Sequence, residues 1–207
     1  FREQIAYTVH QHAAKQKRLA ARGIKVISLF FIDRVGNYVG DDAIIRRLFD
    51  EVFVAQRHAL DSWQGLEPSA VQVAYFAQRR TKAGEVILED SRTGEAEKDA
   101  EAYDLIMRDK ERLLSFDEPR CFVFSHSALR EGWDNPNVFQ ICTLHQTASE
   151  MKKRQEIGRG VRLAVNQHGE RVREPDANVL TVVANESYED YVRHLQDEVE
   201  QEFGRRD

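Results

Sequence analysis

The sequence contains few of the residues that define several protein classes. Its 207 residues include 2 Cys, 4 Pro and 11 Gly, which excludes a disulfide-rich, collagen-like or low-complexity chain. No Gly is followed by Lys, so the phosphate-binding loop GxxxxGK(S/T) is missing from these residues. The longest apolar run, residues 24–32, is interrupted by Lys25 and Ser28 and falls far short of the roughly 20 residues that cross a bilayer. We therefore expect no membrane-spanning segment.

The composition favours a folded protein of a reducing compartment. Hydrophobic residues make up 42% and charged residues 31% of the chain, as in ordinary globular domains. The net charge of -5 provides no general basic field, so a nucleic-acid site would have to be a local patch. Cys121 and Cys142 lie in apolar, strand-like runs, which indicates reduced core thiols and a cytoplasmic location. The His and Cys residues lack metal-ligand spacing, so no metal site is expected.

The spacing of apolar residues predicts strands that alternate with helices. Nearly continuous apolar runs are typical of strands covered on both faces, and segments of helical periodicity lie between them. The predicted strands are 25–32, 71–76, 121–124, 138–144 and 178–184, and the predicted helices are 2–22, 41–60, 98–114, 149–160 and 187–203. Residues 77–98 interrupt this order and are predicted to form a small hairpin insertion. The predicted fold class is α/β, with a mostly parallel β-sheet covered by helices on both faces.

Three polar clusters follow predicted strands or lie beside them. They are Asp33 with Arg34, residues 125–136, and residues 155–162. Because ligands of parallel α/β sheets bind at the carboxyl ends of the strands, we expect all three clusters to face one rim. The basic runs 15–22 and 152–154 are interpreted as solvated helix faces rather than as a nucleic-acid patch.

The third cluster has the form QxxGRxxR. On a helix, Arg159 and Arg162 would project from the same face, with Gln155 about one turn earlier. Guanidinium groups bind phosphate bidentately and stay charged, so the pair suits stabilisation of a transferring γ-phosphoryl group. Gly158 would allow close packing of substrate phosphates or of a neighbouring lobe. The alternative is a helix carboxyl end whose arginines interact with the helix dipole.

The polar clusters resemble sequence motifs of a known family. Residues 125–138, SHSALREGWDNPNV, and residues 155–163, QEIGRGVRL, resemble motifs V and VI of superfamily 2 helicases, in wording most like the Res subunit of type III restriction enzymes. Residues 28–38, SLFFIDRVGNY, resemble motif IV of that family. The flanking stretches 103–125 and 178–192 extend the resemblance over most of the chain.

The resemblance implies a second RecA-like lobe, a three-layer domain, of an ATP-driven DNA translocase. Residues 1–22 would be a lead-in helix from the preceding lobe, and residues 23–207 would be the helicase C-terminal domain. The resemblance makes Arg162 the arginine finger and Arg159 its companion. The residues that it assigns to ATP binding are Gln155, Gly158, Gly132 and Asp134.

DNA contacts are assigned by the same resemblance. The residues that would lie beside the DNA backbone are Asp33, Arg34, Ser125, His126 and Ser127. Many relatives have a Thr about eight residues before the Asp of motif V, where this chain has His126. Which of the three residues 125–127 takes that contact is therefore open, and His126 is equally well interpreted as a structural hydrogen-bonding residue. Trp133 is interpreted as a packing residue.

The resemblance also implies partners and cofactors. These are double-stranded DNA, an amino-terminal RecA-like lobe, a downstream nuclease domain and a methyltransferase subunit, with ATP and Mg²⁺ bound mainly through the first lobe. The FDEP sequence at residues 116–119 superficially resembles the Mg²⁺-binding acidic pair of Walker B, but it follows a helix-like stretch, and we reject it. We expect the isolated lobe to hydrolyse neither ATP nor DNA. The alternatives are another superfamily 2 defence translocase without a nuclease, and a non-catalytic RecA-like interaction module.

Overall fold

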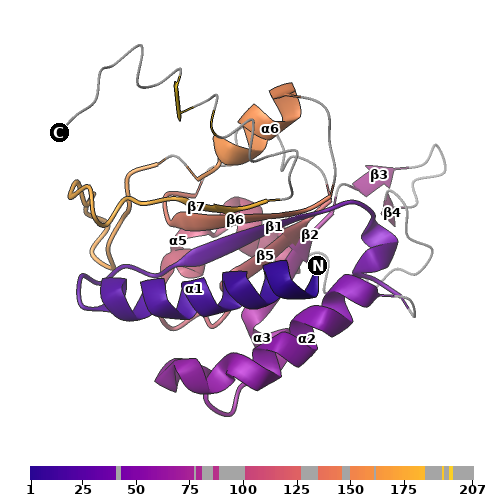
Figure 1. Cartoon of the computed structure of the whole chain (residues 1–207), viewed down its shortest axis with the longest axis horizontal. Helices are drawn as coiled ribbons and strands as arrows, with labels where there is room; N and C mark the ends of the chain where they lie inside the picture. Colours follow the sequence, from indigo (N-terminus) through magenta and orange to yellow (C-terminus); the bar gives the residue numbers. More distant parts are fainter. Residues whose placement is uncertain are drawn as a thin grey trace.

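The fold is a parallel α/β sheet in a three-layer arrangement of the RecA-like type (Figure 1). The computed structural model describes residues 1–40, 43–76, 78–80, 86–88, 101–126, 135–145, 150–160, 162–184, 193 and 196–197. The sheet consists of β1 (Ile27–Ile32), β2 (Gln72–Tyr75), β5 (Phe122–Ser125), β6 (Val138–Leu144) and β7 (Thr181–Val183). Its strand order is β2-β5-β1-β6-β7, and all four pairings are parallel. The predicted fold class is confirmed.

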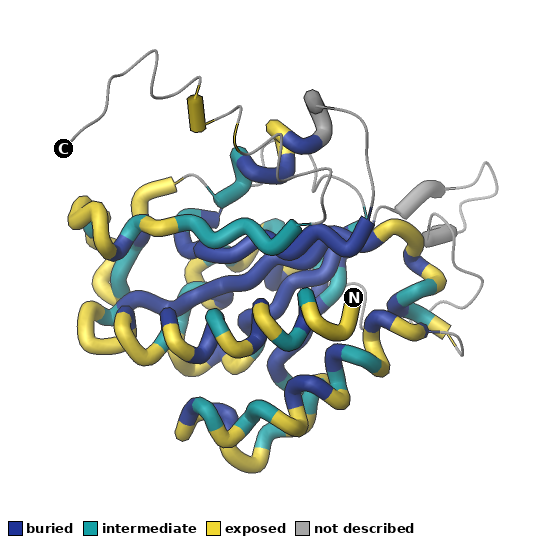
Figure 2. The backbone as a smooth tube through the Cα atoms, viewed as in Figure 1, coloured by how far each residue is buried: buried dark blue, intermediate teal, exposed yellow. Residues whose placement is uncertain are grey.

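One face of the sheet is covered by α1 (Arg2–Ala20), α2 (Ile44–Gln56) and the short α3 (Pro68–Val71). Phe30 of β1 packs there with Phe49 of α2, and their ring centroids are 6.1 Å apart. The short 3-10 turns η1 (Val35–Asn37), η2 (Arg57–Ala59) and η3 (Asp61–Trp63) join these elements. Figure 2 shows the buried backbone running through the sheet, with exposed positions on the outer sides of the helices.

The opposite face is covered by the π-helical segment η4 (Asp104–Arg108), α5 (Lys110–Leu114) and α6 (Glu150–Ile157). Leu29 and Phe31 of β1 point to this side and share a core with Leu105 and Leu113. Within the predicted insertion, β3 (Gln78–Arg80) pairs antiparallel with β4 (Val86–Leu88), which confirms a hairpin.

Helix α1 covers most of the helix predicted at residues 2–22. Gly23 follows it with φ +67°, a left-handed conformation that glycine adopts without a steric penalty. Ile5 and Val9 are fully buried in the same core as the sheet residues Phe30 and Phe122. The division of the chain at residue 22 stays a prediction, although α1 packs as part of this domain.

The interpretation of residues 15–22 as a solvated basic face is wrong for Lys15. Its side chain is buried, and Nζ donates hydrogen bonds to the carbonyl oxygens of Phe139 at 3.0 Å and Val179 at 2.8 Å. A third bond, of 2.9 Å, reaches Oγ1 of Thr181 in β7. Burial lowers the pKa of Lys15 to about 8. Lys15 therefore ties α1 to the edge strand, which charge counting along the helix did not reveal.

The single helix predicted at residues 98–114 is also wrong, because two segments meet at Asp109. This residue leaves helical geometry, with φ −104° and ψ 58°, and its carboxylate accepts a hydrogen bond from the backbone N–H of Arg112. An acidic side chain that caps a new helix competes with continuation of the old one. The helix predicted at 41–60 similarly ends at Gln56 and gives way to 3-10 turns.

Three further sequence predictions concern the two cysteines, the helix ends and membrane-spanning segments. Cys121 and Cys142 are buried free thiols, as predicted. Most of the closing helix predicted at 187–203 lies outside the described residues, and residues 193, 196 and 197, which are described, are helical. The proposed helix caps at Asp41 or Asp42 also lie outside the described residues. Among the residues that the structure describes, no helix has the length and apolarity needed to cross a membrane.

His12 is a buried histidine between α1 and the sheet. Its Nδ1 lies 2.8 Å from Oγ of Ser28, and its ring centroid is 4.5 Å from that of Phe122. Burial, together with the charges of Lys25 and Lys15, lowers its pKa from 6.5 to about 3. The folded state therefore keeps this ring neutral.

Acid is expected to destabilise the protein through His12. Below pH 6.5, the ordinary pKa of a histidine, the unfolded chain binds a proton that the folded state excludes down to about pH 3. Over this window the free energy of unfolding should fall by up to about 1.4 kcal/mol per pH unit. Urea unfolding between about pH 7 and pH 5 should show a shallower slope for His12→Gln than for wild type. His10→Gln, at an exposed position of the same helix, should keep the wild-type slope. Equal slopes for wild type, His12→Gln and His10→Gln would contradict the conclusion that His12 causes the acid destabilisation.

Candidate functional site

The strand register brings two of the predicted clusters to one rim of the sheet. Phe31 of β1 lies opposite Ser125 of β5. Asp33 and His126 therefore follow neighbouring parallel strands at the same carboxyl edge, as predicted. Ser125 itself is buried within β5, whereas His126 is half-buried at the rim. Ser127, Gly132, Trp133 and Asp134 lie outside the described residues.

Asp33 shapes the turn that follows β1. Its Oδ1 accepts a hydrogen bond of 2.9 Å from the backbone N–H of Arg34 and a second from the side-chain amide of Asn37. A carboxylate bonded to nearby backbone and side-chain donors fixes a local turn. Arg34 is exposed beyond it. At this rim the geometry therefore assigns Asp33 to shaping the turn and presents Arg34 to solvent.

Helix α6 carries the beginning of the third cluster and lies over β6. Glu156 is fully buried, and its Oε1 is 3.0 Å from Nε2 of His145, the residue that follows β6. Gln155 faces solvent. Lys153 is buried, so the interpretation of residues 152–154 as a solvated face is wrong at this position. The His145–Glu156 contact was not predicted, because nothing in the spacing of 11 residues indicates a pair.

The two arginines of the cluster do not lie on a helix. Helix α6 ends at Ile157, and the backbone then turns, with the N–H of Gly160 donating to the Ile157 carbonyl oxygen at 3.0 Å. Arg159, half-buried, belongs to this turn, and Arg162, exposed, follows it. The predicted shared helical face is therefore wrong. Arg159 and Gly160 donate backbone hydrogen bonds to residues three positions earlier, rather than four as in an α-helix. This tighter turn ends the helix before Arg162.

Gly160, rather than Gly158, makes the close packing contact. A Cβ at residue 160 would lie 2.4 Å from Cδ1 of Leu180 and 3.2 Å from the carbonyl oxygen of Val138. At Gly158 the nearest atom would be the carbonyl oxygen of Arg154, in the preceding turn, at 3.1 Å. Val138 begins β6, so the turn lies near the amino ends of the strands. The expectation that all three clusters face one rim is therefore wrong for the Gly160 end of this cluster, whereas Glu156 near its start contacts His145 at the carboxyl end of β6.

Comparison of the amino-acid sequence with known proteins identifies relatives of this chain. No family model matches the chain. The Res subunit of the type III restriction-modification enzyme EcoP15I from Escherichia coli is 37% identical over 174 residues, which is 80% of this chain and 18% of that subunit. The EcoPI Res subunit of Escherichia phage P1 and the StyLTI Res subunit of Salmonella typhimurium are also 37% identical, over 73% and 74% of this chain. The chain is related to type III Res subunits. It spans less than a fifth of the length of these relatives.

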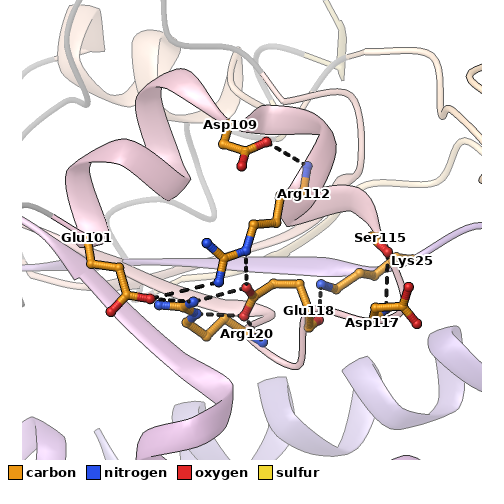
Figure 3. Close-up of polar contacts among 8 residues, drawn as sticks. All are labelled: Lys25, Glu101, Asp109, Arg112, Ser115, Asp117, Glu118 and Arg120. Atoms are coloured by element: carbon orange, nitrogen blue, oxygen red, sulfur yellow. Dashed lines mark hydrogen bonds and ion pairs between the residues drawn. The ribbon is translucent and has the colours of Figure 1, made fainter.

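In this relative of the Res subunits, the acidic pair at residues 117–118 lies before β5, at the amino edge of the sheet. Figure 3 shows Glu118 held by two arginines: its Oε1 is 2.6 Å from Nε of Arg120, and its Oε2 is 3.0 Å from Nε of Arg112. Burial alone would raise the pKa of Glu118, but the hydrogen bonds and charge of Arg120, with the charge of Arg112, hold that pKa below its usual range. Lys25 donates to the Glu118 carbonyl oxygen. These contacts give Glu118 a structural role.

An open hollow of about 770 Å³ adjoins this charged cluster, lined in part by Ser69, Asp109 and Asp117. It lies at the edge opposite the carboxyl ends of β1 and β5. Within the described part of the chain, no group of three or more His, Cys, Asp or Glu side chains is arranged to hold a metal ion.

Gly160→Ala is expected to destabilise the protein by about 1–3 kcal/mol, the usual cost of overpacking. The added methyl group would displace Leu180 and press against a backbone oxygen that cannot move aside. Urea unfolding measures the change. Gly36→Ala is the matched control, since nothing lies within 4 Å of its Cβ position, and it should leave stability nearly unchanged. Equal stability of the two variants would show that the turn does not pack as described.

Proposed function

We propose that this chain is the second RecA-like motor lobe of an ATP-dependent DNA translocase within a type III-like restriction endonuclease subunit. The observation that carries the proposal is the QxxGRxxR segment, which presents exposed Gln155 and Arg162 beside half-buried Arg159 on a parallel α/β fold related to Res subunits. A guanidinium at the surface can reach a nucleotide that another lobe holds, whereas a buried one cannot.

In this proposal Arg162 is the arginine finger. Its permanently charged, planar guanidinium would stabilise negative charge on the transferring γ-phosphoryl group, with Arg159 and Gln155 as companions. Gly132 and Asp134 are proposed to lie near the nucleotide and the interface between lobes. ATP and Mg²⁺ would be bound mainly by an amino-terminal RecA-like lobe, since this sequence has no GxxxxGK(S/T) loop. The isolated lobe should therefore hydrolyse neither ATP nor DNA.

The rim at the carboxyl ends of β1 and β5 is the proposed DNA track. Arg34 is exposed there, and His126 is half-buried beside it, so both can contact backbone phosphates. Asp33 supports the turn that presents Arg34. Ser125 and Ser127 stay candidates from the sequence, although burial of Ser125 favours His126. Phosphate contacts carry no sequence information, so binding should be indifferent to sequence and sensitive to salt.

The remaining parts of the proposed machine lie in other domains or subunits. A downstream nuclease domain would cleave double-stranded DNA, and a methyltransferase subunit would recognise the target. Closure of the two lobes around ATP would bring Arg162 and Arg159 to the phosphates, and opening after hydrolysis would shift the DNA contacts. A cytoplasmic location fits this assignment.

Arg162→Ala should abolish DNA-stimulated ATP turnover in the native-length protein. Loss of an arginine finger lowers kcat on the order of a thousandfold or more, while DNA affinity, which depends on other residues, should persist. ATPase assays and DNA-binding titrations measure the two effects. Arg173→Ala, which removes another exposed arginine from the same part of the chain, is the matched control and should retain turnover. Unchanged turnover in Arg162→Ala would overturn the proposed function.

A further inference from the structure

The contact between His145 and Glu156 joins the end of β6 to the last turn of α6. Both side chains are buried, with 3% and 0% of their surfaces exposed, and Nε2 lies 3.0 Å from Oε1. With Glu156 ionised, Nε2 must carry the hydrogen and donate it, whether the ring is neutral or protonated. The pair lies inside the segment that leads to Arg159 and Arg162, yet the functional assignment above gives it no role.

Apolar burial by the described side chains of α6 is limited. The helix has eight residues, too short to be stable without tertiary contacts. Among its described side chains, Lys153, Glu156 and Ile157 are buried, and only Ile157 is apolar. Across the described residues 153–157 the apolar face is therefore small, and hydrophobic contacts, which are not directional, resist sliding or rotation of this part of the helix only weakly. The directional hydrogen bond of Glu156 restricts both movements.

The pair is itself held on the sheet side. His145 continues β6, whose residues 138–144 are all buried, and its ring centroid lies 6.5 Å from that of Phe31. Glu156 is adjacent to Gln155 and three residues before Arg159. A shift of Glu156 therefore moves these side chains directly, and a displacement of about 1 Å at a catalytic group can cost on the order of a hundredfold in rate.

We propose that His145 and Glu156 are positioning residues that set the placement of Gln155, Arg159 and Arg162 for ATP hydrolysis. This inference rests on the proposed function of those three residues. Neither His145 nor Glu156 touches the nucleotide in this account; they act through α6. Glu156 supplies the acceptor and His145 the donor, so each can be altered while the turn and its arginines stay chemically intact.

The test compares ATPase kinetics of Glu156→Gln and Glu156→Leu in the native-length protein. The amide oxygen of Gln can still accept from Nε2 of His145, so Glu156→Gln should keep kcat close to wild type. Leu cannot accept, and kcat should fall about tenfold to a hundredfold, with the KM for ATP and the Kd for DNA nearly unchanged. Equal kcat for Glu156→Leu and wild type, or equal losses in both variants, would overturn the proposal.

A matched control separates positioning from general weakening of the fold. Ser28→Ala removes the hydrogen bond of His12, a second buried histidine, which lies between α1 and the opposite face of the sheet. It should lower thermal stability but leave kcat unchanged. If Ser28→Ala lowers kcat as much as Glu156→Leu does, the effect is general destabilisation and the positioning role fails.

A double variant keeps the proposal testable if Glu156→Leu folds poorly. The single substitution leaves the buried His145 without its carboxylate partner, which destabilises the fold. His145→Phe combined with Glu156→Leu replaces both polar partners by apolar groups, which should restore stability. Its kcat should stay low, because the directional contact is still missing; recovery of kcat together with stability would overturn the proposal. Arg162→Ala, assayed in parallel, distinguishes failure of the proposed function from failure of the positioning role. If Arg162→Ala retains turnover, the proposed function fails, whatever the Glu156 variants do.

Discussion

Strand β1 imposes the constraint on which the rest of the domain depends. It lies between β5 and β6, and all six of its residues are buried. Phe30 and Ile32 face α1 and α2, whereas Leu29 and Phe31 face η4 and α5. A parallel strand that is apolar on both sides is stable only between two helical layers. The covering helices, and the connections that cross from one strand to the next, follow from that requirement.

Polar side chains inside these layers fix how the helices lie on the sheet. Hydrophobic contacts are not directional, so they allow α1 to slide, but Lys15 bonds three oxygens of the segments around β6 and β7. His12 bonds Ser28 in the central strand. Each such buried group loses hydration and is tolerated only where its partner is in place. The buried polar groups therefore select one placement of α1 among several that would bury similar apolar area.

Periodicity in the sequence predicted the parts of the fold that depend on burial alone. The five strands were predicted because their apolar runs are continuous, and the rim with Asp33 and His126 followed from parallel geometry. Properties that depend on partners distant in sequence were not predictable. Lys15 has the pattern of a solvated residue until its oxygen partners are known. The break at Asp109 has a local cause, the cap that its carboxylate makes to the N–H of Arg112, but the apolar periodicity continues across it and hides the break. The path of the chain after Ile157 likewise depends on Gly160 fitting against Leu180.

The QxxGRxxR segment is held against the sheet at two separate points. Glu156 is fixed to His145 near the carboxyl end of β6, and Gly160 packs against Val138 at the amino end of the same strand. Arg159 lies between these points, and Arg162 lies two residues beyond. Because both anchors contact the same strand, the stretch between them, which includes Arg159, is fixed to the sheet at both ends. Under the proposed function, movement of the lobe as a body would carry Arg159 toward a nucleotide without refolding of the segment that holds it.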